Sequence, residues 1–262
     1  MQISFFVEFP KTDLEGLKYL SWPTKLYITA RNLEEFNNLK KKFKNKYVKE
    51  FIYWPALSKK EGYWISPFSK KEGLRRIFQE LENKKVPVMI DAELPTTQNP
   101  LLYITQLFNF FGNRRLIRSF IKDYKDINVA EYYPQGKLMN SVLKVLGLHF
   151  DPKIYGCRSI KMVYHSMHKF KKEFITKELE EGVKRFGKNY LVAYGVMYHG
   201  NSWENKITSQ QLKTDLEIAQ KTKIEEIIIF RLAGLNKTFS SLIKKYSIEK
   251  IQPKNIYTNC SY

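Results

Sequence analysis

Residues 86–95 read Val-Pro-Val-Met-Ile-Asp-Ala-Glu-Leu-Pro, a short apolar run that closes on two carboxylates. The run holds β-branched residues of the kind that suit a buried strand. Successive side chains on a strand alternate between its two faces, so Asp91 and Glu93 share one face. The stretch therefore predicts a buried strand with a pair of acids at its carboxyl end.

Seven other runs of the same kind alternate with stretches of helical spacing. The apolar runs cover residues 3–9, 25–30, 50–57, 127–133, 159–166, 190–198 and 226–232, and the helical stretches include 71–83, 101–124, 136–146, 171–186, 208–221 and 239–246. Strands that alternate with helices pair in parallel through right-handed crossovers, and eight such units are the number at which a parallel sheet closes. We therefore predict an α/β fold, a (β/α)8 TIM-type barrel.

An open, doubly wound sheet is the alternative arrangement for this pattern. No GxGxxG or GxxxxGK[ST] motif follows the first run, so the usual nucleotide sites of open sheets are missing. The chain has 262 residues, 43% of them hydrophobic, and no Gly/Ser/Pro-rich tract long enough to serve as a linker. We predict that residues 1–262 form a single barrel domain that uses no cofactor.

Cysteine content and the length of the apolar runs bear on location. Cys157 and Cys260 are too few for a disulfide framework, and no CxxC or Cys/His pattern for zinc is present. No apolar run is long enough to span a bilayer, and residues 1–10 resemble a first strand rather than a signal peptide. These observations predict a cytoplasmic protein without a membrane span.

The chain is strongly basic, with 45 Lys and Arg against 26 Asp and Glu and a net charge of +19. Such a charge attracts polyanions or acidic substrates, but lysines spread over helices and loops also serve as plain solvated surface. Residues 113–118 and 168–172 are basic stretches that favour a nucleic-acid partner, yet no nucleic-acid module is recognisable. Both interpretations of the charge stay open.

Polar or aromatic residues close nearly every predicted strand. In (β/α)8 barrels the active site lies at the carboxyl ends of the strands, so these residues are the candidates for function. In strand order they are Glu8, then Tyr53 and Trp54, Asp91 and Glu93, Glu131 with Tyr132 and Tyr133, Tyr164 and His165, Tyr198 and His199, and Arg231.

Two adjacent buried carboxylates raise the pKa of one of them, which keeps a general acid protonated near neutral pH. Glycoside hydrolysis needs such an acid and a second carboxylate about 5 to 9.5 Å away. We predict Asp91, Glu93 and Glu131 as catalytic residues acting on a saccharide or an anionic glycoconjugate. The alternative is that one acid of the pair only caps a loop or forms an ion pair with Arg231 or a lysine.

The remaining strand-end side chains are predicted to bind the substrate, since aromatic rings stack on sugar faces and polar tips bond to hydroxyls. They are Glu8, Tyr53, Trp54, Tyr133, Tyr164, His165, Tyr198, His199 and Arg231.

Two short segments resemble a known family. Residues 91–93, Asp-Ala-Glu, resemble the end of the DxxDxDxE motif of glycoside hydrolase family 18 chitinases, and residues 162–164, Met-Val-Tyr, resemble the start of that family's MxYD motif. Family 25 lysozymes also carry a DxE on a barrel strand. The chitinase resemblance implies that Glu93 protonates the glycosidic oxygen, Asp91 orients a reacting acetamido group and Tyr164 supports it. Met89 stands where the family has an acid, and His165 where it has an aspartate.

Other functions fit the same strand ends. Glu8, Asp91, Glu131, His165 and His199 are residue types that could hold a metal, as in the metal-dependent sugar isomerases and epimerases with barrel folds. No HxH or HExxH spacing is present, so no metal ligand is predicted. A barrel that binds a saccharide or a nucleic acid without catalysis is the remaining alternative.

Overall fold

The computed structural model describes residues 1–132, 137–164, 170–198 and 206–247. Eight parallel strands pair in chain order and close on themselves, because β8 pairs with β1. The strands are β1 (Gln2–Val7), β2 (Thr24–Ala30), β3 (Val48–Pro55), β4 (Val88–Ala92), β5 (Ile127–Glu131), β6 (Arg158–Val163), β7 (Tyr190–Gly195) and β8 (Glu226–Phe230). The predicted (β/α)8 barrel is confirmed.

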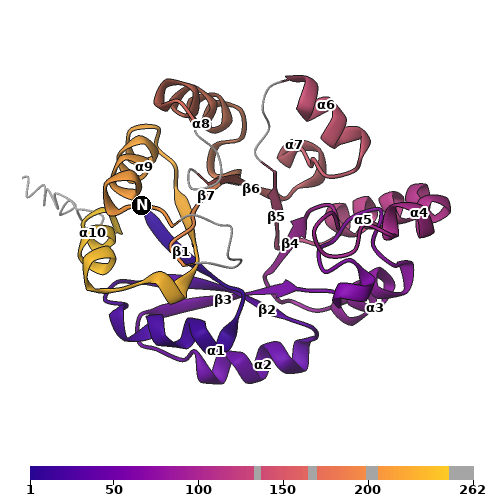
Figure 1. Cartoon of the computed structure of the whole chain (residues 1–262), viewed down its shortest axis with the longest axis horizontal. Helices are drawn as coiled ribbons and strands as arrows, with labels where there is room; N and C mark the ends of the chain where they lie inside the picture. The colour runs from indigo at the N-terminus through magenta and orange to yellow at the C-terminus, as the bar shows by residue number, and fades with distance from the viewer. Residues whose placement is uncertain (133–136, 165–169, 199–205, 248–262) are drawn as a thin grey trace, which may run out of the picture.

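Helices surround the strands on all sides (Figure 1). The α-helices are α1 (Pro10–Asp13), α2 (Leu33–Lys42), α3 (Lys71–Leu81), α4 (Leu102–Thr105), α5 (Phe110–Asp123), α6 (Lys137–Val145), α7 (Pro152–Tyr155), α8 (Lys172–Phe186), α9 (Ser209–Lys221) and α10 (Lys237–Ser247). Short 3-10 helices are η1 (Leu14–Tyr19), η2 (Lys59–Glu61), η3 (Leu107–Asn109), η4 (Gly187–Asn189) and η5 (Leu232–Gly234). The stretch 101–124, predicted as continuous, is divided into α4, η3 and α5.

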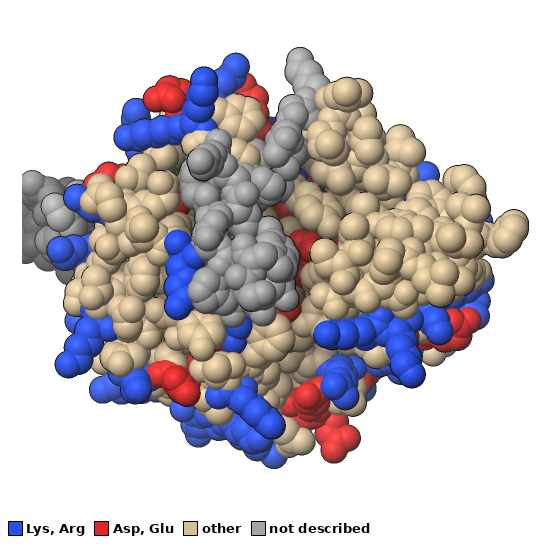
Figure 2. All heavy atoms as spheres, in the orientation of Figure 1, with Lys and Arg blue, Asp and Glu red and all other residues tan. Residues whose placement is uncertain are grey.

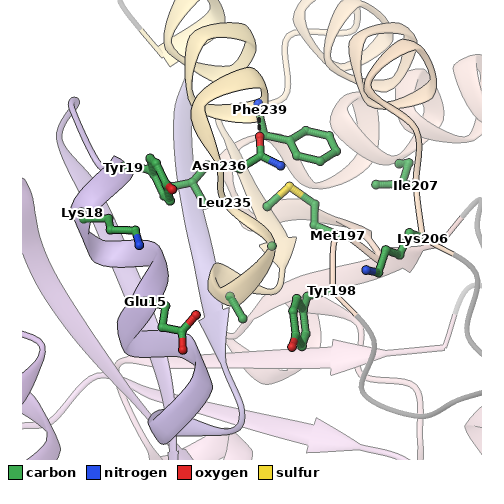
Figure 3. A pocket seen from close by; sticks show the side chains of 12 residues that line it. Glu15, Lys18, Tyr19, Met197, Tyr198, Lys206, Ile207, Leu235, Asn236 and Phe239 are labelled. Carbon is green, nitrogen blue, oxygen red and sulfur yellow. Dashed lines mark hydrogen bonds between the residues drawn. The ribbon is translucent and has the colours of Figure 1, made fainter.

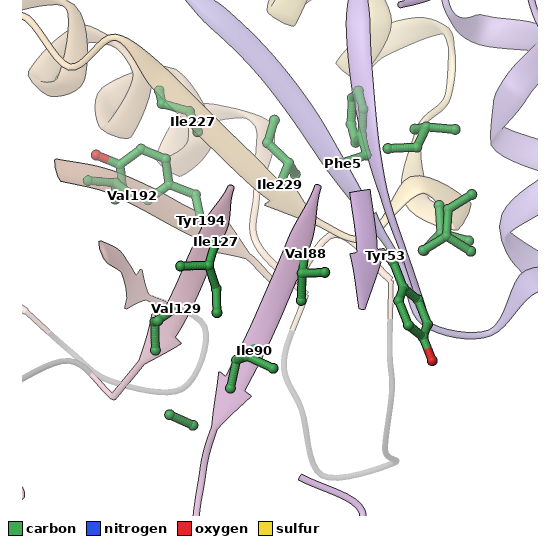
Figure 4. Packing of buried hydrophobic residues seen from close by; sticks show 14 of the residues in the cluster. Phe5, Tyr53, Val88, Ile90, Ile127, Val129, Val192, Tyr194, Ile227 and Ile229 are labelled. Carbon is green, nitrogen blue, oxygen red and sulfur yellow. The ribbon is translucent and has the colours of Figure 1, made fainter. Parts of the chain in front are cut away.

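Alternation along the strands builds two apolar layers. One set of buried side chains comes from the strands and their ends alone and fills the barrel: Phe6, Tyr27, Ile52, Trp54, Met89, Ala130, Ile160, Leu191, Ala193, Val196, Ile228 and Phe230. The alternate set, which includes Phe5, Val88, Ile90, Val129 and Ile229, packs outward under the helices (Figure 4). The interior is thus a packed core, as in other barrels of this kind, and a ligand must bind above it.

No helix within the described ranges is long and apolar enough to cross a membrane.

Candidate active site

Three carboxylates lie together at the C-terminal end of the barrel, called the mouth below. Glu8 follows β1, Asp91 lies near the end of β4, and Glu93 comes just after that strand. Asp91 is two residues beyond Met89, which points into the barrel, so the carboxyl lies on the inner side one step nearer the mouth. Asp91 is buried, and the other two are partly exposed. We call Glu8, Asp91 and Glu93 the acid cluster.

The environment of the acid cluster favours protonated carboxyl groups. Burial raises the pKa of Asp91 well above its usual value, and the nearby charges of Glu93 and Glu8 raise it further. Burial, and next the charge of Glu8, raises the pKa of Glu93 to about 8. The Oδ1 atom of Asp91 is buried and has no hydrogen-bond partner within the described part of the chain. A carboxyl group that holds its proton near neutral pH is equipped to act as a general acid.

A tyrosine that the sequence did not single out completes one side of the cluster. Tyr63 donates its hydroxyl hydrogen to Oε1 of Glu8 at 2.8 Å. Burial and then the charge of Glu8 raise the pKa of the Tyr63 hydroxyl, so it stays a donor. Its backbone has φ +62°, following Gly62 at φ +121°, so the chain turns sharply here. The N–H of Ile65 donates to the Asp91 carbonyl at 3.0 Å and fixes this loop to the end of β4.

The loop has a recognisable sequence signal. Ser58 and Glu61 form a capping box around η2, in which each side chain bonds the other's backbone N–H. Gly62 follows directly. A capping box that runs into glycine predicts a tight turn, but the direction of the next side chain depends on packing, which the sequence pattern does not define.

On the other side of the cluster, Tyr132 stands beside Glu93. Its hydroxyl oxygen accepts a hydrogen bond from the N–H of Leu94 at 3.2 Å. Burial, and then the charge of Glu93, raises the pKa of the Tyr132 hydroxyl. Tyr132 follows β5, whereas Leu94 follows β4, so this bond ties two strand ends together next to the candidate acid.

Aromatic rings form the floor of the mouth. Phe6 packs on Trp54 and Phe230 with ring centroids 5.4 and 6.2 Å apart. Tyr164 packs on Phe230 at 5.9 Å. Of the two that are predicted to bind substrate, Trp54 is buried in the barrel core at 5% exposed, and Tyr164 packs on this core while partly exposed.

Glu131 is not brought to this site. Its neighbour Ala130 points into the barrel, so Glu131 points outward, toward the helices. The carboxylate is fully buried and accepts hydrogen bonds from Lys161 Nζ, from the N–H of Phe150 at 2.9 Å and from His149 Nδ1 at 2.8 Å. Burial alone would raise the pKa of Glu131, but Lys161 and His149 outweigh it and lower the pKa. This arrangement favours a structural role.

Tyr53 lies on the outer side for the same reason. Its neighbours Ile52 and Trp54 both point into the barrel. The Tyr53 ring packs on Phe36 of α2 with centroids 5.1 Å apart, and its hydroxyl lies 3.4 Å from Glu80. The side chain is therefore part of the layer beneath the helices and does not reach the mouth.

Arg231 is held by an acid other than those of the cluster. Its Nε donates to Oδ1 of Asp13 at 2.9 Å, and its guanidinium lies over the rings of Phe9 and Tyr198 at 4.5 and 5.1 Å. Asp13 also accepts from the N–H of Phe9 and of Ala233, each at 2.9 Å. This buried pair joins α1 to the end of β8 and positions Tyr198 at the rim.

Tyr198 also lines a pocket of about 340 Å³ between η1, η5 and the segment after β7 (Figure 3). Lys18 and Lys206 border this pocket from opposite sides, and Lys206 lies 5.4 Å from the Tyr198 ring. The sequence pattern does not predict this pocket, because its lining comes from three parts of the chain that are far apart, within residues 15–19, 197–207 and 233–239.

Three predicted substrate-binding residues, Tyr133, His165 and His199, lie outside the described residues. Within the described ranges, no group of three His, Cys, Asp or Glu side chains is placed to hold a metal ion.

Comparisons with known proteins bear on the fold. No family model and no curated protein matches the sequence. Among solved structures, the glycoside hydrolase domain of PgaB (BpsB) from Bordetella bronchiseptica is similar with a TM-score of 0.54 at 9% identity, over 94% of this chain and 98% of that one. A chitinase from Chromobacterium violaceum is similar with a TM-score of 0.52 at 8% identity, over 95% and 99%.

A third similar structure is the 3-keto-D-glucoside 4-epimerase YcjR from E. coli, with a TM-score of 0.52 at 13% identity, over 93% of this chain and 99% of that one. At such identities the likeness shows the fold, a barrel of the kind that both glycoside hydrolases and an epimerase use. Function has to be argued from the site.

Proposed function

We propose that the protein is a glycoside hydrolase-like enzyme that acts on a saccharide or glycoconjugate through the acid cluster. The observation that carries this proposal is the pair of neighbouring carboxyl groups, buried Asp91 and partly exposed Glu93, whose pKa values are raised at the mouth of the barrel. Glycosidic bonds break when a carboxylic acid protonates the departing oxygen and a second carboxyl group assists at the sugar carbon. The cluster supplies both groups above an aromatic floor.

In the proposed reaction Glu93 is the acid. It gives its proton to the glycosidic oxygen as the bond from that oxygen to the sugar carbon breaks. Water then supplies a hydroxyl group to the carbon, and its other proton returns to Glu93. Asp91, in the position that the chitinase resemblance assigns to it, orients an acetamido group of the substrate. Tyr63 and Glu8 fix the opposite wall, and the partly exposed Tyr164 offers ring surface to the sugar.

A direct test is to measure reducing ends released from N-acetylhexosamine oligomers and from neutral and anionic oligosaccharides. We expect turnover of at least one of them. Saccharide binding without turnover would instead support a non-catalytic barrel. Binding of nucleic acid that survives physiological salt, with no saccharide bound, would exclude the proposal in favour of the polyanion alternative.

The pH profile should show the raised pKa of Glu93. A general acid works while protonated, so activity should be lost as pH rises through about 8. Glu8→Gln removes a neighbouring negative charge, lowers the pKa of Glu93 and should move this basic limb to lower pH. The matched control is Glu34→Gln, the same change at an exposed position on α2. A Glu8→Gln profile that coincides with the wild type would contradict the assignment.

A chelator separates hydrolysis by carboxyl groups from the epimerase-like alternative. We expect EDTA to leave both turnover and melting temperature unchanged, because the proposed steps use only protein carboxyl groups and water. Loss of activity that a divalent ion restores, together with a fall in melting temperature, would point to a bound metal and overturn the proposed mechanism.

A further inference from the structure

Exposed apolar side chains are gathered on one sector of the protein. Eleven large apolar side chains are exposed within the described ranges, and all but Phe9 belong to this sector. Phe108 is 97% exposed, Leu138 81% and Phe111 75%. The ten residues are Leu101, Ile104, Leu107, Phe108, Phe111, Leu138, Met139, Val142, Val145 and Ile154, which we call the apolar face. Isolated exposed apolar residues are ordinary, but a gathering of this size marks a contact surface.

The two segments that supply most of the apolar face carry no carboxylates. Residues 94–122 and 132–150 contain no Asp or Glu, in a chain that has 26 of them. Their charged residues are Arg114, Arg115, Arg118, Lys122, Lys137 and Lys144. Figure 2 shows the corresponding surface over α4 to α7 as almost free of charged atoms. The sector is therefore apolar at its surface and positive in its net charge.

The helices of this sector are joined to one another. Arg114 and Arg118 of α5 both donate to the carbonyl of Lys144 at the end of α6, at 3.3 and 3.1 Å. Helix α5 also contacts α7. The parts of the apolar face on α4, η3 and α5 thus lie beside those on α6 and α7, as Figure 1 shows for the ribbons.

We propose that the apolar face docks on the surface of a membrane that contains anionic lipids. Apolar side chains that enter the interface, together with Lys and Arg that attract anionic headgroups, are the two contributions by which peripheral proteins bind bilayers. No described helix can cross a membrane, so the helices of this sector would lie on the surface. A second copy fits less well, because each copy brings a net charge of +19 and the same two segments without Asp or Glu.

Docking would orient the mouth. Glu93 and the first residues of the apolar face belong to the same connection, which runs from β4 to α5. A lipid surface against this connection therefore contacts the segment that continues from Glu93. Membrane docking is independent of the proposed hydrolysis and can be measured without a substrate.

The test is cosedimentation of the full chain with vesicles made of equal parts phosphatidylcholine and phosphatidylglycerol, and with vesicles of phosphatidylcholine alone. We expect binding to the anionic vesicles that weakens with salt. The double variant Phe108→Ser, Phe111→Ser should bind at least about tenfold more weakly, because two large apolar side chains no longer leave water. Both side chains are exposed, so the circular dichroism spectrum and melting temperature should match the wild type.

Two double variants test whether vesicle binding depends on the basic residues of this sector or only on the net charge of the protein. Arg115→Glu with Lys144→Glu alters exposed residues on α5 and α6, and Lys41→Glu with Lys42→Glu makes the same change in net charge at the exposed end of α2. We expect the first pair to weaken vesicle binding far more. Equal losses would show that only net charge acts, and absence of vesicle binding by the wild type would overturn the proposal.

A second copy of this chain is the other partner that could cover the apolar face. If the wild type is a dimer by light scattering without lipid, and Phe108→Ser with Phe111→Ser makes it a monomer, the apolar face is a protein interface and the membrane proposal fails. We expect a monomer in both cases.

Discussion

Glu93→Gln should lower the turnover of a natural glycoside by about 10² to 10⁴ while the protein stays folded. Glutamine keeps the shape of the side chain but has no proton to give to the departing oxygen. The measurement is kcat on an oligosaccharide found to be cleaved by the wild type. The melting temperature should not fall, because the substitution removes an ionisable group that burial already disfavours in its charged form.

Leaving groups provide the internal control for this variant. An aryl glycoside whose leaving group departs without protonation should be cleaved by Glu93→Gln at close to the wild-type rate, because the missing proton matters only for poor leaving groups. Asp91→Asn should slow both kinds of substrate, since it acts at the sugar carbon. Full activity of Glu93→Gln on the natural glycoside would exclude Glu93 as the acid.

Glu131→Gln, unlike Glu93→Gln, should reduce stability rather than turnover, and we expect it to lower the free energy of unfolding by about 3 to 5 kcal/mol. The change leaves Lys161 buried without its counter-charge and weakens the bonds to His149 and Phe150. Urea denaturation measures the loss. Activity per folded molecule should persist, because the side chain faces away from the acid cluster. The double variant Glu131→Gln, Lys161→Met should recover part of the stability, since it no longer buries an unpaired charge.

The stability contributed by the Glu131–Lys161 pair should also depend on pH. The folded-state pKa of Glu131 is lowered, so its contribution to stability is present above the unfolded value of about 4.3 and is lost as pH falls through the folded pKa. The difference in stability between wild type and Glu131→Gln should therefore narrow in acid. If Glu131→Gln instead matches the wild type in stability but loses activity per folded molecule at neutral pH, Glu131 takes part in the reaction.

Much of the fold could be predicted because a closed parallel sheet has a repetitive signature. Each strand lies in a short apolar run, and most runs are followed by a stretch of helical spacing, so this pattern is enough to predict the eight strands. The ends were less accurate. The run 190–198 continues beyond β7, which ends at Gly195, because the apolar residues Val196 and Met197 that follow look the same as strand residues.

The candidate site can be predicted from the sequence only where the alternation of side chains along a strand shows which face each residue is on. Asp91 and Glu93 were placed together by their spacing, and both lie in the acid cluster. Glu131 and Tyr53 also lie near strand ends, but nearness to a strand end does not separate the inner face of the barrel from the outer one. Tyr63 depends on a loop conformation with positive φ, which follows from local packing rather than from a periodic pattern.

Arg114 and Arg118 of α5 both bond to the carbonyl of Lys144, within the sector that carries the apolar face. They link the end of α6 to α5 before a partner arrives. Ordering of separate helices is a cost that usually subtracts from affinity, and a preassembled surface avoids most of it. We therefore expect α5 and α6 to bind a partner as one rigid surface. Once α5 is in contact, the contacts of α6 cost little further conformational entropy.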